Sequence, residues 1–413
     1  MNVEVLNTGS ELLLGHVVNT HAAFFGKELF ALGLRVARQT TVPDGPAIGT
    51  ALAESLKRAD LVLVTGGLGP TSDDITREAA AELLGLPLAL DKELLAKIEA
   101  YIRSRGIEPA PINARQAMVP QGAVVLPNAV GTAPGLILTQ EKEGKIVVLL
   151  PGPPRELVPM WREGFLPWFR KRGALPPLHM RSWSIADVPE SRLATMIEAP
   201  LRALPGGADL EIGYCARPGM VDLRLISPDP ARLVPAAALV EKTFGASIAT
   251  VDGETVEAAL VRLLSEKGKT LALAESCTGG LLAHRVTNVP GASKVLHYGW
   301  VVYANEAKVS QLGVPEAYFA ESGPGAVSEE TVRAMAEGAR LRAGADFALA
   351  VTGIAGPDGG TPEKPVGTVW IALATPTGTQ AVLKRFQSDR ETFKNRTAQT
   401  ALDLCRRAVH TSV

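Results

Sequence analysis

Short apolar runs alternate with stretches of helical apolar spacing along the first 170 residues of the chain. The runs predict strands at Val3–Asn7, Asp60–Val64 and Ile146–Leu150, and the spaced apolar residues predict helices at His16–Leu32, Ala47–Arg58 and 75–84. Strands that alternate with helices are typical of a parallel α/β domain. Residues 1–170 are therefore predicted to form such a domain.

The middle of the chain changes to a β-α-β-β-α order. Strands are expected near 181–186, 209–215 and 220–226, with helices near 190–203 and 230–243 and a hairpin turn at Ala216–Gly219. This order resembles a KH module, a fold that binds nucleic acid, but the sequence lacks its Gly-x-x-Gly loop and gathers no basic residues on one element. We expect a KH-like α+β spacer or dimerisation domain over residues 175–250, and not an RNA-binding module.

A second alternation of helices and strands fills residues 253–413. Helices are predicted at 254–267, 279–288, Glu329–Arg342 and Arg390–Arg407, and strands at His297–Tyr303, Asp346–Thr352 and Gly367–Ala374. Asn305 and Ser328 precede helical segments and are predicted to be N-cap residues. The predicted fold class is therefore α/β at both ends of the chain, with the smaller α+β domain between them.

Composition and charge narrow the function classes. The chain has 413 residues, enough for two or three domains, and it is 46% hydrophobic and 21% charged, as soluble globular proteins are. Its formal net charge of −1 favours neither nucleic acid nor an anionic membrane as a partner. No apolar run approaches a membrane span, the start resembles no signal peptide, and three distant cysteines indicate neither zinc nor disulfides. We expect a cytoplasmic protein, with a homodimer as the default assembly.

Candidate chemistry centres on the turn after the strand-like run Thr270–Ala274, where Glu275-Ser276-Cys277 precedes two glycines. Ser276 is either a helix N-cap or a nucleophile beside unpaired backbone N–H groups. As a nucleophile it would use the N–H groups at Cys277–Gly279 as an oxyanion hole. Cys277 is the rival nucleophile, and its alternative role is that of a small buried apolar residue.

A serine nucleophile needs a base, and Lys308 is the candidate. With Asn305 as N-cap, Lys308 falls in the first turn of a helix, where the helix dipole disfavours a cation and lowers the lysine pKa. A neutral lysine can then take the Ser276 proton near neutral pH, with Tyr303 as a relay or orienting group. The alternative is a surface lysine whose charge lies in solvent.

A glycine-rich loop, Gly353–Gly360, follows a predicted strand and is expected to face the Ser276 turn. Arg390 and Lys394 lie near the start of the last helix. They are candidates to hold a phosphate, and the default alternative for such residues is a solvated helix face.

Five segments of this region carry a specific resemblance: LALAESCTGG (271–280), VVYANEAK (301–308), GAVSEE (325–330), TGIAGPDGG (352–360) and KPVGTVW (364–370). They resemble the nicotinamide mononucleotide deamidase domain of the competence-damage-inducible CinA family, which is described as a group of serine–lysine amidohydrolases that need no cofactor. The resemblance implies Ser276 as nucleophile, Lys308 as base and Tyr303 as its helper. It also implies substrate contacts at Cys277, Thr278, Gly279, Gly353, Ile354, Ala355, Gly356, Arg390 and Lys394.

The first domain holds a second candidate site. Gly66-Gly67-Leu68-Gly69 follows the strand at 60–64, and open α/β sheets bind their ligands at such strand ends. The loop is neither a dinucleotide fingerprint nor a P-loop, since GxGxxG and Gly-Lys-Ser/Thr are both absent. Asp73 and Asp74 either favour the positive end of the next helix or hold magnesium or manganese against a phosphate.

The segments TGSELLLG (8–15), VTGGLGPTSDD (64–74), NARQAM (113–118), GTAPG (131–135) and PGPPREL (151–157) resemble the N-terminal domain of the same family. That domain is similar to molybdopterin-binding domains and is associated with metal-dependent hydrolysis of ADP-ribose to AMP and ribose 5-phosphate. The resemblance implies a divalent cation (Mg, Mn or Co), with or without K, on Asp73 and Asp74. It implies substrate contacts at Gly66, Gly67, Gly69, Thr71, Asn113, Gln116 and Arg155.

These resemblances together predict a bifunctional hydrolase of NAD breakdown products, with small nucleotides as its ligands. Ser10 stands where many relatives have aspartate, and it favours the alternative that the first domain binds a nucleotide or molybdopterin without catalysis. A DNA-associated role, suggested by the family's name, is disfavoured by the net charge of −1.

Overall fold

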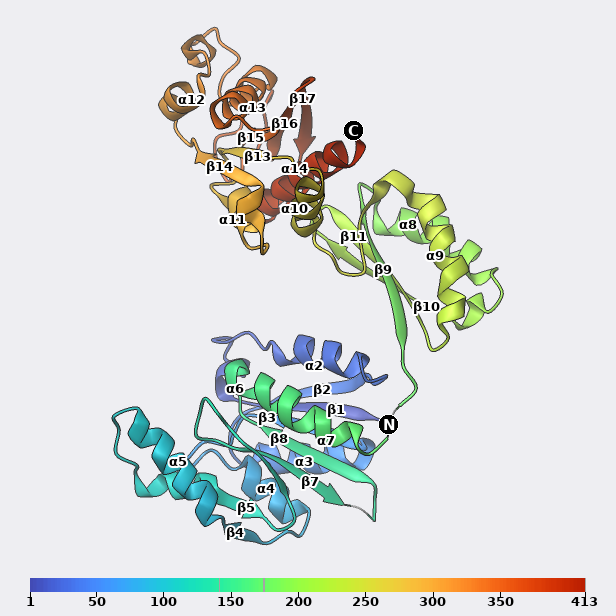
Figure 1. Ribbon diagram of the computed structural model, residues 1–413, viewed down its shortest axis with the longest axis vertical. Coiled ribbons are helices and arrows are strands. Elements are labelled where there is room, and N and C mark those ends of the chain that lie inside the picture. The colour runs from blue at the N-terminus through green and yellow to red at the C-terminus, as the bar shows by residue number, and fades with distance from the viewer. Residues whose placement is uncertain (141, 174, 413) are drawn as a thin grey trace. The chain divides into compact units, whose positions relative to one another are not determined.

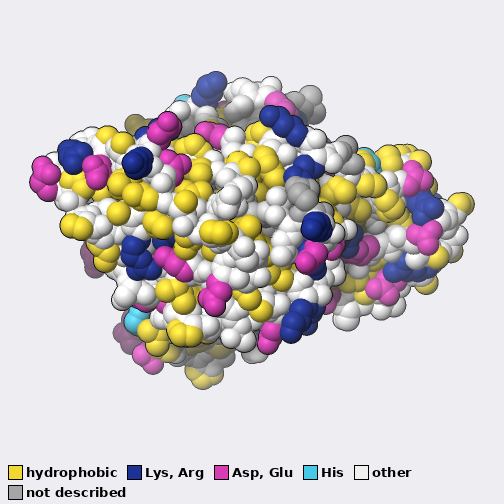
Figure 2. All heavy atoms as spheres, turned by 90° about the horizontal axis from the view of Figure 1, so that it is seen from below, with side chains coloured by type: hydrophobic (Ala, Val, Ile, Leu, Met, Phe, Trp, Pro, Cys, Tyr) yellow, Lys and Arg dark blue, Asp and Glu magenta, His cyan; other side chains and the backbone are white. Residues whose placement is uncertain are grey.

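The computed structural model describes residues 1–140, 142–173 and 175–412, and the chain divides into two compact units, Met1–Leu178 and His179–Val413 (Figure 1). Both units contain helices and β-sheets, so the predicted α/β class is confirmed. Among the described residues, no helix is both long enough and apolar enough to span a bilayer. On the face drawn in Figure 2, basic and acidic side chains are interspersed, so neither sign of charge gathers into a patch there.

The first unit is built on a six-stranded sheet with the order β2-β1-β3-β8-β7-β6. Its strands are β1 (Val3–Thr8), β2 (Val36–Val42), β3 (Leu61–Thr65), β6 (Val124–Leu126), β7 (Gly135–Gln140) and β8 (Lys145–Leu150). The predicted strands correspond to β1, β3 and β8. β1 pairs in parallel with β2 on one side and β3 on the other, and β3 pairs in parallel with β8. β7 and β6 are antiparallel additions, because β7 ends too close to the start of β8 for the crossover that a parallel strand requires. The sheet is therefore mixed and not purely parallel.

Helices cover both faces of this sheet. On one face α2 (His21–Phe30), α6 (Pro154–Pro159) and α7 (Leu166–Arg170) bury an aromatic cluster that includes Phe25 and Trp161. On the other face lie α3 (Ala47–Arg58) and α4 (Thr76–Leu83). The remaining elements are α1 (Ser10–Leu13), α5 (Lys92–Ser104), a 3₁₀ helix (Pro111–Ala117), a π-helix (Met160–Phe165) between α6 and α7, and the small sheet of β4 (Leu88–Leu90) and β5 (Met118–Pro120).

The helix predicted over His16–Leu32 begins only at His21. Val17 and Val18 belong to the predicted apolar pattern, but they are 52% and 83% exposed. The residues of this helix that contact the sheet start with His21, whose ring nitrogen lies 3.0 Å from the Thr65 hydroxyl of β3. The pattern therefore overestimates the helix at its N-terminal end.

The second unit begins with a four-stranded antiparallel sheet in the order β10-β11-β9-β12. Its elements are β9 (His179–Ala186), α8 (Glu190–Arg202), β10 (Glu211–Arg217), β11 (Met220–Ser227), α9 (Pro230–Phe244) and β12 (Ile248–Val251). The predicted β-α-β-β-α order is present. β12 extends the sheet beyond β9 and was not predicted.

The last part of the second unit is a five-stranded sheet with the order β14-β13-β15-β16-β17. Its elements are α10 (Val256–Glu266), β13 (Leu271–Glu275), α11 (Leu281–Thr287), β14 (Leu296–Val301), α12 (Asn305–Leu312), α13 (Glu329–Ala343), β15 (Phe347–Gly353), β16 (Thr368–Thr375), β17 (Gly378–Arg385) and α14 (Arg390–Thr411). β14, β13 and β15 are parallel, whereas β16 and β17 are antiparallel. Helices α10, α11 and α14 pack on one face, and α12 and α13 on the other.

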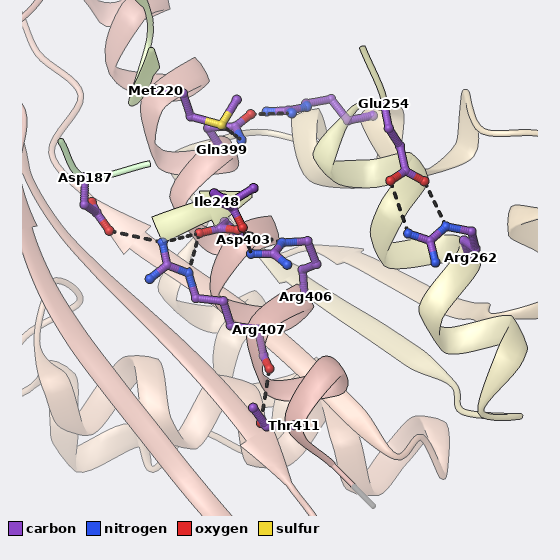
Figure 3. A network of polar contacts seen from close by, with 11 residues as sticks. Asp187, Met220, Ile248, Glu254, Arg262, Gln399, Asp403, Arg406, Arg407 and Thr411 are labelled. Carbon is purple, nitrogen blue, oxygen red and sulfur yellow. Dashed lines mark hydrogen bonds and ion pairs between the residues drawn. The ribbon is translucent and has the colours of Figure 1, made fainter. Parts of the chain in front are cut away.

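Helix α14 joins the two sheets of the second unit (Figure 3). Arg407 pairs with Asp187, which follows β9, at 3.4 Å. Gln399 contacts the Met220 sulfur at the start of β11 at 3.3 Å, and its carbonyl oxygen accepts a hydrogen bond from Arg285 of α11 at 2.7 Å. The closing helix therefore connects the smaller sheet to the helix that follows β13.

Candidate functional site

Ser276 lies at the carboxyl end of β13, between the ends of two neighbouring parallel strands. The Glu275 carbonyl oxygen accepts a hydrogen bond from Val302 N–H at 2.8 Å, just beyond β14. Ser276 N–H donates to the Val351 carbonyl oxygen of β15 at 3.1 Å. The strand pairing therefore holds Ser276 between the loop after β14 and the loop after β15, which are the loops that carry Tyr303 and Gly356.

Lys308 is buried in the first turn of α12, with 1% of its surface exposed. Its Nζ donates a hydrogen bond to the Tyr303 carbonyl oxygen at 3.0 Å, and within the described residues no hydrogen bond joins it to the Ser276 hydroxyl. Burial lowers the pKa of Lys308, although the negative charge of Glu306 opposes this shift. The alternative of a solvated surface lysine is therefore excluded.

The predicted N-cap of α12 is wrong. Asn305 is the first residue of the helix, and Ala304, which precedes it with extended backbone, offers no side-chain cap. Lys308 keeps its predicted place in the first turn, but the lowering of its pKa comes first from burial and not from the helix dipole. The predicted N-cap Ser328 is confirmed, since its side chain accepts a hydrogen bond from Thr331 N–H at 3.2 Å.

Cys277 and Thr278 compete poorly with Ser276 as nucleophiles. Burial raises the pKa of the Cys277 thiol to about 12, so the thiol stays protonated at neutral pH. The Thr278 side chain is fully buried, and its hydroxyl donates to a Glu275 carboxylate oxygen at 2.7 Å. The positive charges of Lys308 and Lys394 oppose the rise in the pKa of the Cys277 thiol.

Glu275 is a functional residue that sequence reasoning missed. Its carboxylate is 1% exposed and accepts backbone hydrogen bonds from the first residues of the α11 turn, at 3.0 Å from Gly280, 3.0 Å from Leu282 and 2.9 Å from Ala283. A buried carboxylate therefore satisfies the N-terminus of α11 and opposes its positive end. A side chain that points back to cap its own following helix leaves no periodic signal in the sequence.

A backbone hydrogen bond within this turn leaves fewer N–H donors for the predicted oxyanion hole than expected. Gly279 N–H, one of its expected donors, is bonded to the Ser276 carbonyl oxygen at 3.1 Å. In the described part of the chain, the N–H groups of Cys277 and Thr278 are the two in this turn that donate to no other residue. The donors available to an oxyanion are therefore these two, and Gly279 is not one of them.

Replacing Glu275 with Gln is expected to destabilise the second unit by about 3 kcal/mol, because the amide NH2 group cannot accept from a buried N–H and the negative charge that strengthens the remaining hydrogen bonds is lost. For a unit of this size the midpoint of thermal unfolding should fall by roughly 6–12 °C. Calorimetry of the full chain measures this fall. Glu330→Gln, an exposed residue in the first turn of α13, is the control and should change little; an unchanged midpoint for Glu275→Gln would contradict the capping role.

Arg390 joins the two loops that flank Ser276. From the first residue of α14 its guanidinium donates to the Gly356 carbonyl oxygen at 2.8 Å and to the Tyr303 hydroxyl at 3.0 Å. The ammonium of Lys394 lies 3.9 Å from the point where a Cβ on Gly279 would stand. Both basic residues therefore lie at the candidate site, while the Tyr303 ring is 60% exposed and bonded to Arg390.

Residues 353–355 of the predicted glycine-rich loop belong to the sheet or pack against it. Ile354 exchanges backbone hydrogen bonds with Thr368 and Gly367, each at 2.8 Å, and Gly353 still belongs to β15. Ala355 is 7% exposed and packs in the core. Of the four predicted residues 353–356, Gly356 is the one in contact with another predicted site residue.

The candidate site of the first unit is a cavity of about 600 Å³ at the carboxyl ends of β1, β3 and β8. It brings together the predicted residues Gly66, Gly67, Gly69, Thr71, Asp73, Asp74, Gln116 and Arg155. Asn113 is not among its lining residues, because its side-chain oxygen accepts a hydrogen bond from Ala110 N–H at 2.9 Å and holds the 3₁₀ helix. Sequence reasoning missed the acidic lining residues Glu11, Asp44 and Glu156.

The glycines of this cavity are required by close contacts. Gly67 has φ 65°, and a Cβ there would stand 2.1 Å from the Thr76 hydroxyl. A Cβ on Gly69 would stand 2.3 Å from a carboxylate oxygen of Asp74. Arg115, also unrecognised from sequence, holds the loop from the other side through the carbonyl oxygens of Thr71 and, at 3.2 Å, Asp74.

Asp73 and Asp74 suit a cation that is shared with a bound phosphate better than one that is held by protein ligands alone. The Thr71 hydroxyl lowers the pKa of Asp73, and Thr71 N–H donates to an Asp74 carboxylate oxygen at 3.1 Å, so Thr71 acts on both carboxylates. The described residues contain no cluster of three or more His, Cys, Asp or Glu side chains that could hold a metal ion. The two carboxylates lie in the same cavity as the glycine loop Gly66–Gly69. This arrangement fits magnesium, which protein sites often hold by one or two carboxylates together with substrate phosphates.

The fold and the two sites define a protein of two α/β units, each with a candidate site at the carboxyl ends of parallel strands. Residues 4–171 match the family described as "Probable molybdopterin binding domain", and residues 253–409 match "CinA C-terminal domain". The chain is 47% identical over 403 residues to a CinA-like protein of Akkermansia muciniphila, with 97% of this chain and 96% of the relative covered. It therefore belongs to the CinA family.

Further relatives span the same length or a part of it. A CinA-like protein of Gloeobacter violaceus is 43% identical over 418 residues, which cover 99% of this chain and 96% of the relative. The crystal structure of a competence/damage inducible protein from Agrobacterium tumefaciens is 38% identical and covers 38% of this chain and 96% of its own, with a TM-score of 0.35.

Proposed function

We propose that the C-terminal part of the second unit hydrolyses the carboxamide of nicotinamide mononucleotide to nicotinate mononucleotide and ammonia. The observation that supports this most is the buried amine of Lys308, whose lowered pKa suits a general base, beside the turn that carries Ser276. The protonated thiol of Cys277 and the engaged hydroxyl of Thr278 favour Ser276 over its neighbours as the nucleophile.

In the proposed reaction the Ser276 oxygen attacks the amide carbon while neutral Lys308 takes the hydroxyl proton. The Cys277 and Thr278 N–H groups stabilise the oxyanion of the tetrahedral intermediate. Lys308 then gives its proton to the departing nitrogen, so that ammonia leaves and an ester on Ser276 remains. Water, with Lys308 again as base, hydrolyses that ester and restores the serine.

The remaining site residues would hold the nucleotide. Arg390 and Lys394 supply positive charge for its phosphate, Arg390 with a planar fork and Lys394 with a point charge. Tyr303 orients Lys308 through its carbonyl oxygen and Arg390 through its hydroxyl. Equal amounts of ammonia and nicotinate mononucleotide from nicotinamide mononucleotide would support this function, whereas release of free nicotinamide would contradict it.

We also propose that the first unit hydrolyses the pyrophosphate of ADP-ribose to AMP and ribose 5-phosphate. Asp73 and Asp74 would hold a divalent cation, which when bound supplies positive charge to the pyrophosphate oxygens. The loop at Gly66–Gly69 brings backbone N–H groups to the same cavity, and Arg155 and Gln116 line it. These residues bind and orient the pyrophosphate.

A second function for this unit, nucleotide binding without hydrolysis, is favoured by Ser10. A serine at position 10 offers no carboxylate to a cation. Its N–H donates to an Asp44 carboxylate oxygen at 2.9 Å, and its hydroxyl oxygen accepts from Asp44 N–H at 3.4 Å. ADP-ribose that binds to the purified chain without forming AMP would decide for this function.

For hydrolysis, Asp74→Asn is expected to lower AMP formation by roughly 100-fold or more, because a neutral side chain binds a divalent cation more weakly. The measurement is AMP release from ADP-ribose across a magnesium titration. Glu82→Gln, an exposed change on helix α4, which begins two residues after Asp74, should leave the rate unchanged. AMP release that is equal in wild type and Asp74→Asn, or that needs no added metal, would contradict the proposed role of the carboxylate.

A further inference from the structure

Helix α11, which follows the Ser276 turn, is fixed to its surroundings by polar groups at both ends. The helix is only seven residues long. At its N-terminal end the buried Glu275 carboxylate accepts backbone hydrogen bonds. At its C-terminal end Arg285 donates from one guanidinium nitrogen to a carboxylate oxygen of Glu257 and to the side-chain carbonyl oxygen of Gln399, each at 2.7 Å. Neither end of α11 can therefore move without the loss of one of these contacts.

Arg285 connects three helices. Glu257 lies in the first turn of α10, Arg285 in the last turn of α11, and Gln399 within α14. The Arg285 and Glu257 side chains are 18% and 17% exposed, and Gln399 is 7% exposed. Gln399 also contacts the Met220 sulfur at 3.3 Å (Figure 3). Hydrogen bonds of a charged group that are largely shielded from water are stronger than exposed ones, so this contact holds its partners in place.

The helix α14 also carries the residues that are proposed to hold the substrate phosphate. Arg390 is its first residue and Lys394 its fifth, and Gln399 follows Lys394 by five residues. The Lys394 ammonium lies 3.9 Å from the point where a Cβ on Gly279 would stand. The segment that begins at the Ser276 turn and ends with α11 therefore meets α14 twice, first at Lys394 and then at Gln399.

The apolar contacts between α11 and α14 do not define this alignment by themselves. Leu282 and Val286 of α11 belong to an apolar core that α14 shares. Apolar burial is favourable over a range of positions because it has no direction, whereas a hydrogen bond requires a particular distance and angle. The bond between Arg285 and Gln399 is therefore the contact that defines where α11 lies along α14.

We propose that Arg285 and Gln399 are positioning residues that set the spacing between the Ser276 hydroxyl and the site of the substrate phosphate. This inference rests on the deamidase function proposed for the C-terminal part of the second unit. A phosphate held at α14 places the carboxamide at a fixed distance from that helix. A shift of α11 along α14 would then move Ser276 away from the amide carbon while the substrate stays bound. Displacements of about 1 Å can lower an enzymatic rate by roughly 100-fold.

The first test is Arg285→Met in the full chain, assayed by ammonia release from nicotinamide mononucleotide. We expect kcat to fall at least about 10-fold and KM to stay within about 2-fold of wild type. Arg262→Met is the matched control, because Arg262 pairs with Glu254 and Glu266, which lie just before α10 and at its end. The control should keep both kinetic constants, and an unchanged kcat in Arg285→Met would overturn the inference.

The second test removes the phosphate from the substrate. Nicotinamide riboside has the same carboxamide but no phosphate, so its position does not depend on α14. The preference of the chain for the mononucleotide over the riboside, as a ratio of kcat/KM values, should therefore fall about 10-fold in Arg285→Met. Equal losses on both substrates would assign Arg285 to the general stability of the fold and overturn the positioning role.

Substitutions of the acceptor give an independent result, which decides the question even where the wild type leaves the riboside intact. Gln399→Leu removes the acceptor at similar volume, whereas Gln399→Glu keeps an oxygen for Arg285. Gln399→Leu should reproduce the fall in kcat, and Gln399→Glu should stay within about 3-fold of wild type. The double variant Arg285→Met/Gln399→Leu should be no slower than either single variant, because both remove the same contact. Equal losses in the two Gln399 variants would overturn the inference.

The outcomes separate this inference from the function on which it rests. A wild-type chain that releases no ammonia from nicotinamide mononucleotide would overturn the deamidase function and the positioning role together. An active wild type with an equally active Arg285→Met variant would overturn the positioning role alone.

Discussion

Ser276→Ala is expected to lower ammonia release from nicotinamide mononucleotide by roughly 10⁴-fold or more. The Ser276 side chain supplies the oxygen that forms the ester intermediate, and neither neighbour can replace it. The Cys277 thiol has its pKa raised to about 12 by burial, and the Thr278 hydroxyl is bonded to Glu275. The measurement is initial-rate ammonia release by the full chain at saturating substrate.

Cys277→Ala is the matched control, since it removes the rival nucleophile one residue away. The rate of this variant should stay within about 10-fold of wild type, because the thiol acts as a small buried apolar group in the core of the second unit. A Cys277→Ala variant that loses activity as Ser276→Ala does, or a Ser276→Ala variant with full activity, would move the nucleophile away from Ser276. AMP formation from ADP-ribose should be the same in both variants, because their residues belong to the other unit.

Much of this architecture is predictable because it is local. A buried run such as Leu61–Thr65 has strand character wherever it lies in the fold, and the glycines that follow it mark a strand end. The same holds for β13 and the turn at Ser276. Because parallel strands end at the same edge of a sheet, local signals also predicted that Ser276 and the loop at Gly353–Gly360 would meet.

Residues whose role depends on one particular side-chain hydrogen bond were predicted wrongly or not at all. In the sequence Glu275 follows a strand-like run and has no marked role. In the structure its buried carboxylate accepts hydrogen bonds from the N–H groups of Leu282 and Ala283 in α11. Arg115 lies more than forty positions from the carbonyl oxygens of Thr71 and Asp74 that it holds. Asn113 accepts a hydrogen bond from Ala110 N–H at the start of its own 3₁₀ helix, and it does not line the cavity. A spacing pattern contains no information on such long-range or purely local side-chain choices.

The apolar pattern also did not predict that strands at the edges of the two sheets pair antiparallel. β6 and β7 in the first unit, and β16 and β17 in the second, pair antiparallel at the edges of sheets whose other strands pair in parallel. Strand propensity does not state direction, and direction is decided by how short the connection is.

Lys308→Arg is expected to lower kcat/KM for nicotinamide mononucleotide by roughly 10³-fold, because a guanidinium stays protonated and cannot serve as the base. In the wild type, burial lowers the pKa of Lys308 below its ordinary value of 10.5. The neutral amine is therefore gained as pH rises through that lowered pKa and is lost as pH falls below it.

The pH profile separates a base from a structural lysine. Wild-type kcat/KM should rise with pH along a limb whose midpoint lies below 10.5, and Lys308→Arg should lack that limb as well as the rate. Lys294→Arg, an exposed change before β14, should keep both. A Lys308→Arg variant that retains the wild-type limb would assign the titration to another group. Since the arginine keeps the positive charge near Cys277 and the Tyr303 carbonyl oxygen, loss of rate together with loss of the limb would reflect the missing neutral amine.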